Sequence, residues 1–321
     1  MIILQTLYIL GNGFDLAHGI ETRYADFRKY LEENHESFLK IFEEMYFIQR
    51  LDDTEPWYTD EAQKKWNESV LEDLWWSFEE KIGHPDVEGM HGIAYSLVDT
   101  MPAEGILDTM DSYWKEQYGF VNELQHYVLE WIESIDVSNA ICKKEELVNN
   151  KNDLFMSFNY TSTLESVYGI DYVFHIHGGV SSCCKQTPIM GHGNKYIIDH
   201  YRRKAKEAQN QFIEWYESIC NATADFCESM YKDTDFIIRK NYGFFSNLNN
   251  VEKVVCLGIS FGDVDIPYLN EIQKKVPSET KWIVYYYNES DLNRLKSVFG
   301  ITGISRNFET YFFQSNQFWD R

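Results

Sequence analysis

The chain has 321 residues, of which 44% are hydrophobic and 25% are charged, and its formal net charge is -22. This length allows one large domain or two smaller ones. The acidic balance argues against a broad nucleic-acid interface, because such an interface requires a basic surface. An anionic ligand would therefore need a local binding device, such as the backbone amides at the start of a helix.

The six cysteines include no C-x-x-C pair, so we expect reduced thiols in a cytoplasmic protein. They are Cys142, Cys183, Cys184, Cys220, Cys227 and Cys256. The N-terminal run MIILQTLYIL has neither a basic start nor a cleavage site, and Gly-Asn-Gly interrupts it. We therefore expect neither a signal peptide nor a membrane span.

Short apolar runs, most of them continuous rather than alternating, predict a parallel sheet that is covered on both faces. In chain order they are TLYIL, LFMSF, YVFHIH, VVCL, IVYYY and, as an edge strand, TYFFQ. Segments able to form helices follow at 161–168, 264–276 and 289–299. This alternation predicts an α/β protein with a doubly wound, Rossmann-type parallel sheet.

Two stretches without strand signals show helical periodicity instead. The first contains Phe38, Ile41, Phe42 and Met45, then Val121, Leu124, Val128, Trp131 and Ile132. In the second, one face is formed by Phe212, Trp215, Tyr216 and Ile219. We expect a helical insertion or cap at 36–150 and a further helical segment at 200–232. The remaining ranges, 1–35, 151–199 and 233–321, are expected to form a nucleotide-binding domain.

Glycines and polar residues follow five of the predicted strands. They are Gly11-Asn12-Gly13, Asn159, His177-Gly178, Gly258-Ile259-Ser260 and Asn288. Ligands of open parallel sheets bind outside the carboxyl ends of the strands. The sequence therefore predicts one site that is built from five distant segments.

Gly11-Asn12-Gly13 allows two interpretations. It is either a tight turn with Asp15 as the N-cap of the next helix, or a loop whose amides hold a pyrophosphate. In the second case Asp15 would face a sugar hydroxyl, an amide or a positively charged ring. Leu16 stands where a dinucleotide fingerprint has its third glycine.

The other polar residues have similar alternatives. In SFNYTSTLE, Thr161 can cap a helix while Asn159 faces the sheet edge. In HIHGG, the strand period of two predicts that His175 and His177 share a face. His192 in MGHGN is a third candidate histidine. Further residues that either cap helices or bind ribose are Ser260, Asp263 and Asn288.

The blocks LYILGNGFDLAHGIETRYADF, SFNYTSTLE, HIHGG, GHGN and LGISFGDVDI resemble those of the bacterial phage abortive-infection family AbiH. The same blocks are distantly similar to sirtuin-like domains, which bind NAD on a Rossmann-type sheet. Gly11 and Gly19 keep the spacing of the sirtuin-like first loop, although Asn12 and Asp15 replace its small residues. The zinc module of protein deacylases has no counterpart, so deacylation is not expected.

The resemblance implies phage defence in the bacterial cytoplasm, by hydrolysis of the N-glycosidic bond of NAD or a related nucleotide. Asn159 would orient the ribose or the water, and His177 would accept a proton. The helical cap would close over the site. NAD binding, without a metal, is assigned to Gly11, Asn12, Gly13, Asp15, Gly258, Ser260, Asp263 and Asn288.

Two other functions remain open at this point. The first is a nucleotide-binding sensor without turnover, as a homo-oligomer or as part of a defence complex, and without a membrane partner. The second is a metal-dependent phosphohydrolase or nuclease that uses nitrogen and oxygen ligands. Its ligands would be His175, His177 and His192 with Asp15 or Asp263.

Overall fold

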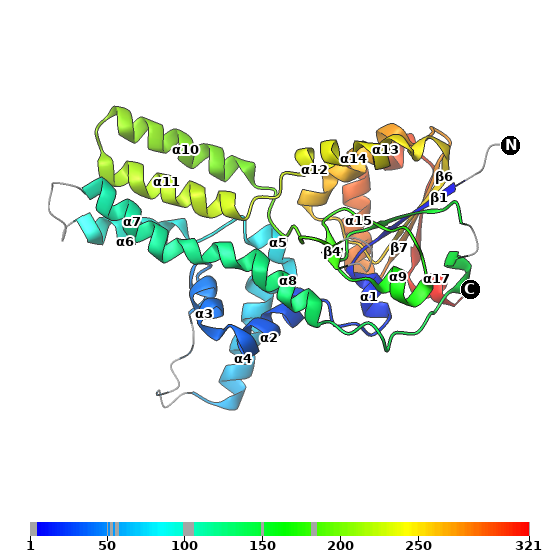
Figure 1. The fold of residues 1–321 in the computed structure, drawn as a ribbon, viewed down its shortest axis with the longest axis horizontal. Coiled ribbons are helices and arrows are strands. Elements are labelled where there is room, and N and C mark those ends of the chain that lie inside the picture. Colours follow the sequence, from blue (N-terminus) through cyan, green and yellow to red (C-terminus); the bar gives the residue numbers. More distant parts are fainter. Residues whose placement is uncertain are drawn as a thin grey trace. The chain divides into compact units, whose positions relative to one another are not determined.

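The computed structural model describes residues 5–49, 51, 54, 58–98, 106–148, 151–180 and 185–320 (Figure 1). The predicted thiols Cys183 and Cys184 lie outside these residues, whereas Cys142, Cys220, Cys227 and Cys256 are free cysteines. The chain divides into two compact units, which we call the sheet unit and the helical unit. The sheet unit comprises Met1–Arg23, Leu129–Ile189 and Asp233–Arg321, and the helical unit comprises Tyr24–Val128 and Met190–Lys232.

The sheet unit is built on a six-stranded sheet with the order β3-β2-β1-β6-β7-β8, in which every pair of neighbours is parallel. Its strands are β1 (Gln5–Leu10), β2 (Leu154–Ser157), β3 (Phe174–His175), β6 (Val251–Leu257), β7 (Lys281–Tyr286) and β8 (Thr310–Gln314). A separate antiparallel pair is formed by β4 (Gly179–Val180) and β5 (Lys185–Gln186). The predictions of an α/β fold, a parallel sheet and a C-terminal edge strand are confirmed.

Apolar side chains on both faces of the sheet are buried by helices, as the continuous apolar runs require. One face, which includes Ile9 and Val254, packs against α12 (Thr234–Lys240), α13 (Tyr242–Ser246), α14 (Ile266–Lys275), α15 (Glu289–Ile301) and α16 (Ile304–Asn307). The other face, which includes Leu10 and Leu257, packs against α1 (Asn12–Ala17), α9 (Thr163–Tyr168) and α17 (Asn316–Trp319). The helices predicted at 161–168, 264–276 and 289–299 are therefore present.

The predicted strand YVFHIH is much shorter than expected, because β3 contains only Phe174 and His175. The N–H of Gly178 donates to the carbonyl of His175 at 3.2 Å and closes a turn. Gly178 has a φ of +73°, which favours glycine. His177 therefore lies in a turn, and the period of two does not extend to it.

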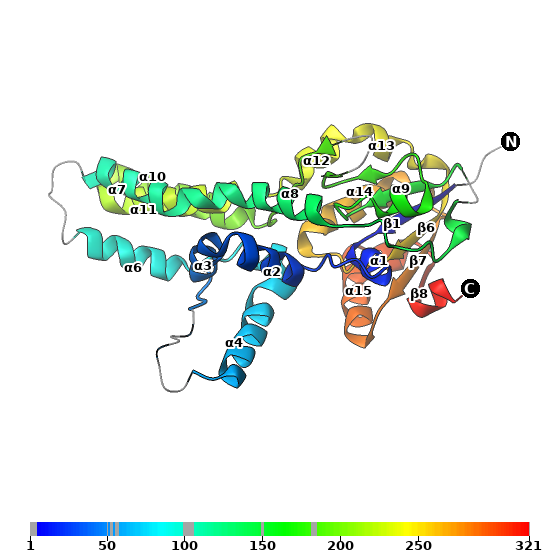
Figure 2. The same cartoon turned by 60° about the horizontal axis from the view of Figure 1, so that its bottom comes forward.

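The helical unit has an aromatic core in which Phe42, Trp75 and Phe78 are fully buried and the last two rings stack at 4.6 Å. Figures 1 and 2 show α10 and α11 side by side. The helices are α2 (Tyr24–Asn34), α3 (Glu36–Glu44), α4 (Asp60–Asp73), α5 (Phe78–Lys81), α6 (Val87–Val98), α7 (Ile106–Tyr118), the first part of α8 (Leu124–Ser134), α10 (Lys195–Asn210) and α11 (Glu214–Ser229).

One expected helical face in this unit is wrong. The sequence predicts Phe212 on a face with Trp215, but α11 begins only at Glu214. Phe212 lies in the preceding turn with a φ of +58° and is 89% exposed. Within the described residues, no helix combines the length and apolar composition that crossing a membrane requires.

Candidate functional site at the carboxyl edge of the sheet

The two glycine turns at the ends of β1 and β6 pack directly against each other. The N–H of Gly11 donates to the carbonyl of Leu257 at 3.1 Å, and the N–H of Gly13 donates to that of Gly258 at 2.8 Å. A Cβ on Gly258 would lie 2.4 Å from the backbone nitrogen of Phe14. These glycines therefore admit another stretch of backbone, and two of the first-turn amides already have acceptors.

Asn159 joins this pair of turns from the end of β2. Its Nδ2 donates to the carbonyl of Gly11 at 3.1 Å, and its own N–H donates to Ser157 Oγ at the same distance. The pairing of β1 with β2 places Ser157 beside Leu10. The residues that follow these two strands therefore lie close together, which explains the bond from Asn159 to Gly11. The ends of β1, β2 and β6 thus meet at one edge. Asn159 is only 9% exposed there.

Asp15 is 1% exposed and accepts hydrogen bonds from Thr161 Oγ1 at 2.6 Å and Thr163 Oγ1 at 2.7 Å. Burial raises the pKa of this carboxyl, while bonds from both threonines and from Asn159, and the charge of His175, oppose that rise. The capping roles considered for Asp15 and Thr161 are wrong. Gly11 and Ser162 occupy the N-cap positions of α1 and α9 instead.

His175 lies between two hydrogen-bond acceptors. Its Nδ1 is 2.9 Å from the carbonyl oxygen of Asn159, and its Nε2 is 2.9 Å from Glu165 Oε1. Burial alone would lower the pKa of His175. The bond and charge of Glu165, the Asn159 carbonyl and the charge of Asp15 outweigh burial, so the pKa is raised. An imidazolium can donate from both ring nitrogens, to the Asn159 carbonyl and to Glu165, and the raised pKa favours this form.

His177 contacts different partners. It is 3% exposed, and its Nε2 lies 3.3 Å from the hydroxyl of Tyr268 in α14. The Phe158 ring meets it edge-on at 5.2 Å between centroids. Tyr268 and Phe158 belong to the core on one sheet face, whereas Glu165, the partner of His175, lies on α9 at the other. The prediction that the two histidines share a face is wrong, because the turn intervenes.

The remaining predicted ligand residues lie on or near this edge. Asn12 accepts a hydrogen bond from the Thr22 hydroxyl. Ser260 and Asp263 are both exposed, after β6, and their expected capping role is wrong, because Gly262 and Asp265 occupy the N-cap positions there. Asn288 is exposed after β7 and accepts from the N–H of Asp291 at 2.9 Å, so its capping role is confirmed.

His192 has a structural environment within the helical unit. Its Nε2 donates to the carbonyl of Cys227 at 2.9 Å, and its Nδ1 accepts from the N–H of Asn194 at 3.0 Å. Burial lowers the pKa of His192 to about 4, so the ring is neutral near pH 7. Across the described ranges, no group of three or more His, Cys, Asp or Glu side chains is arranged to hold a metal ion.

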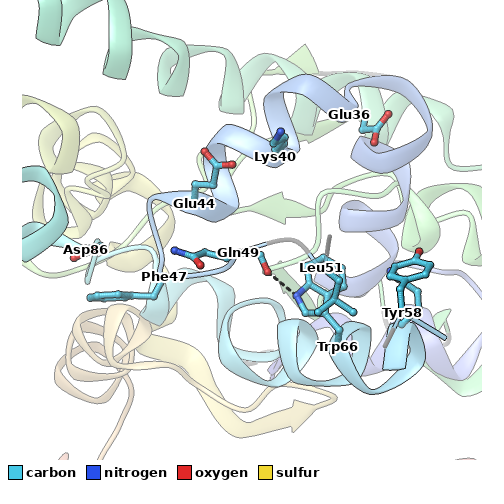
Figure 3. A pocket seen from close by; sticks show the side chains of 10 residues that line it. Glu36, Lys40, Glu44, Phe47, Gln49, Leu51, Tyr58, Trp66 and Asp86 are labelled. Carbon is cyan, nitrogen blue, oxygen red and sulfur yellow. Dashed lines mark hydrogen bonds between the residues drawn. The ribbon is translucent and has the colours of Figure 1, made fainter. Parts of the chain in front are cut away.

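The helical unit also contains a pocket of about 840 Å³ (Figure 3). Its lining includes the aromatic side chains of Phe47, Tyr58 and Trp66, and Trp66 Nε1 donates to the carbonyl of Gln49 at 2.8 Å. The other lining residues are Glu36, Lys40, Glu44, Leu51, Gln63 and Asp86. None of the predicted site residues belongs to it.

Three side chains at the sheet edge were missed by sequence reasoning: Thr163, Glu165 and Tyr268. The first two lie within SFNYTSTLE, where a threonine pair at i and i+2 is a usable signal for a shared polar partner. Tyr268 carries no such signal, because an aromatic residue on an amphipathic helix ordinarily indicates core.

A family model described as bacteriophage abortive infection AbiH matches residues 7–286. This range contains both glycine turns, Asn159, and the three candidate histidines. No curated protein matches the sequence. Because the family match covers most of the chain, the protein belongs to the bacteriophage abortive infection family AbiH.

Proposed function

We propose that this protein, whose family implies a role in abortive-infection defence against phage, hydrolyses the N-glycosidic bond of NAD or a related nucleotide. The observation that carries the proposal is the bond from Asn159 to the carbonyl of Gly11, which in turn packs against the Gly258 turn. It gathers three strand ends at the edge where parallel sheets bind ligands.

The chemistry requires few groups. When the bond between C1′ of the ribose and the nicotinamide nitrogen breaks, its electron pair goes to the ring, which leaves uncharged and needs no acid. Water attacks C1′, and its proton passes to a base. We assign orientation of the ribose to Asn159, proton acceptance to His177, and stabilisation of the developing positive charge to the buried Asp15.

The rest of the nucleotide is assigned to groups that do not already donate hydrogen bonds within the protein. The amides of Gly11 and Gly13 donate to Leu257 and Gly258, so phosphate binding is assigned to the turn after β6. The exposed residue Ser260 lies in that turn and can offer its hydroxyl. Phe261 in the same turn is buried with a φ of +50°, a strained conformation of the kind that clusters at ligand sites.

The test is incubation of the purified chain with NAD, followed by chromatography for nicotinamide and ADP-ribose. Wild type should release both products, and His177→Ala should be slower by roughly 10²–10⁴-fold, the usual contribution of a general base. His126→Ala, at an exposed histidine of the helical unit, is the matched control and should retain full activity. Absence of product from wild type, with or without phage-infected lysate, would refute hydrolysis.

A second candidate is a nucleotide-binding sensor without turnover. It is favoured by the burial of Asn159 and His177, whose side chains already have hydrogen-bonding partners. This candidate predicts saturable binding of NAD in calorimetry, with no product and with unchanged affinity in His177→Ala.

A further inference from the structure

The strand β8 forms one margin of the sheet (Figure 2). It pairs with β7, and in the described part of the chain no strand pairs with its other side. Its sequence, TYFFQ, contains no charge and no proline. Proteins usually protect such edges with charged residues or prolines, because the open main chain is a template for another strand.

The hydrogen bonds between β7 and β8 show which main-chain N–H and C=O groups of β8 point away from β7. The N–H of Trp282 donates to the carbonyl of Glu309 at 2.9 Å, and the N–H of Ser315 donates to that of Tyr286 at 2.8 Å. In a parallel ladder, every second residue of a strand bonds to the same neighbour. The main-chain groups of Thr310, Phe312 and Gln314 therefore point away from β7.

We propose that β8 pairs antiparallel with β8 of a second copy of this chain, about a two-fold axis at Phe312. Thr310 then faces Gln314 of the second copy, and each Phe312 faces its counterpart. These residues carry the outward main-chain groups, so they form the hydrogen-bonded positions of the new ladder. The result is one continuous sheet that spans both copies.

The side chains favour a copy of the same strand as the partner. Tyr311 and Phe313 stack on one face at 6.3 Å between centroids, and Tyr311 is 38% exposed. In this register Tyr311 lies opposite Phe313 of the second copy at the closer, non-hydrogen-bonded positions, where aromatic pairs stabilise a ladder.

Neither a charge within the paired strand nor the following helix blocks this pairing. The paired segment carries no charge, and the adjoining Glu309 is bonded to Lys281 at 3.1 Å, so no like charges face each other. After β8, the chain turns into α17, whose Phe318 packs on Tyr285 of β7 at 5.1 Å. Helix α17 therefore packs on a face of the sheet through Phe318, and this contact does not cover the outer edge of β8.

The test is analytical ultracentrifugation of the full chain over a wide range of concentration. Wild type should reach twice the mass of one chain. Gln314→Pro removes an outward N–H but keeps the bond from Ser315 to β7, and edge strands accept proline at such positions. We expect it to raise the dimer Kd by roughly 10-fold or more, because it deletes main-chain bonds in both copies. Gln314→Ala, which keeps the N–H, should leave the Kd unchanged.

A second measurement reports the register independently of the proline variant. Equal amounts of Tyr311→Cys and Phe313→Cys are mixed and oxidised, and disulfide-linked dimer should form more readily than from either variant alone. A wild type that stays monomeric at every concentration would overturn the proposal. So would equal dimerisation by Gln314→Pro and Gln314→Ala, or a mixture of the two cysteine variants that cross-links no more readily than either variant alone.

Discussion

Replacing Gly258 with alanine tests whether the glycines at the sheet edge serve backbone packing. The new Cβ would lie 2.4 Å from the nitrogen of Phe14 and 2.7 Å from the Cα of Gly13, and these backbone atoms have no rotamers that relieve the clash. Gly258 also has a φ of +65°, which costs an L-residue about 1–2 kcal/mol. Overpacking typically adds about 1–3 kcal/mol. We therefore expect the free energy of unfolding to fall by about 2–5 kcal/mol.

Gly169 provides a matched control in the same unit. Its φ is also +65°, because it ends α9 in the left-handed conformation, but a Cβ there would meet nothing within 4 Å. Gly169→Ala should therefore lower the free energy of unfolding only by the cost of the left-handed backbone conformation, about 1–2 kcal/mol. Urea denaturation followed by circular dichroism gives both free energies, and the difference between the variants measures the packing of the two turns.

Two results would refute this reasoning. Equal losses in Gly258→Ala and Gly169→Ala would mean that the turns at the ends of β1 and β6 are not in contact. A Gly258→Ala variant that unfolds like wild type but no longer binds NAD would mean that the glycine admits a ligand instead. In the first case the clash with Phe14 is absent, and in the second the pyrophosphate interpretation of the glycines is restored.

Four other predictions concern side chains at single positions. Burial raises the pKa of Asp15 above 3.8, so the unfolding free energy of wild type should fall as the pH rises from 3.8 through the folded value, and Asp15→Asn should flatten that part of the profile. The pKa of His175 is raised above 6.5, so its stabilisation is complete below 6.5 and is lost as the pH rises through the folded value. In an NMR titration, Glu165→Gln should make the His175 ring titrate at lower pH. The pKa of His192 is lowered to about 4, so its stabilisation is complete above 6.5 and is lost as the pH falls towards 4, a loss that His192→Gln should remove from an acid-denaturation curve. Ser260→Ala should weaken NAD binding in calorimetry while changing the unfolding free energy by less than about 0.5 kcal/mol, because the residue is exposed. Profiles parallel to those of wild type would contradict the pH assignments, and unchanged NAD affinity would contradict the role of Ser260.

The sheet could be predicted from the sequence because a parallel strand buried on both faces has to be continuously apolar. That rule located β1, β2, β6 and β7, whereas TYFFQ was predicted separately as the edge strand β8. The parallel arrangement then brought the strand ends to one edge. Side-chain partners were beyond such reasoning. Local capping rules assigned Asp15 and Thr161 to separate helix ends, yet the fold pairs them across 146 residues of sequence. A buried carboxylate needs donors, and tertiary structure decides which segment supplies them.

A glycine pair after a strand signals close approach to the backbone without identifying what approaches. At Gly11 and Gly13 it is the Gly258 turn, which satisfies the same steric signal as a pyrophosphate would. Substitutions at these glycines therefore change folding and binding together, whatever the ligand is. Only side chains that reach the edge without holding it together, such as the exposed Ser260, can separate the two effects.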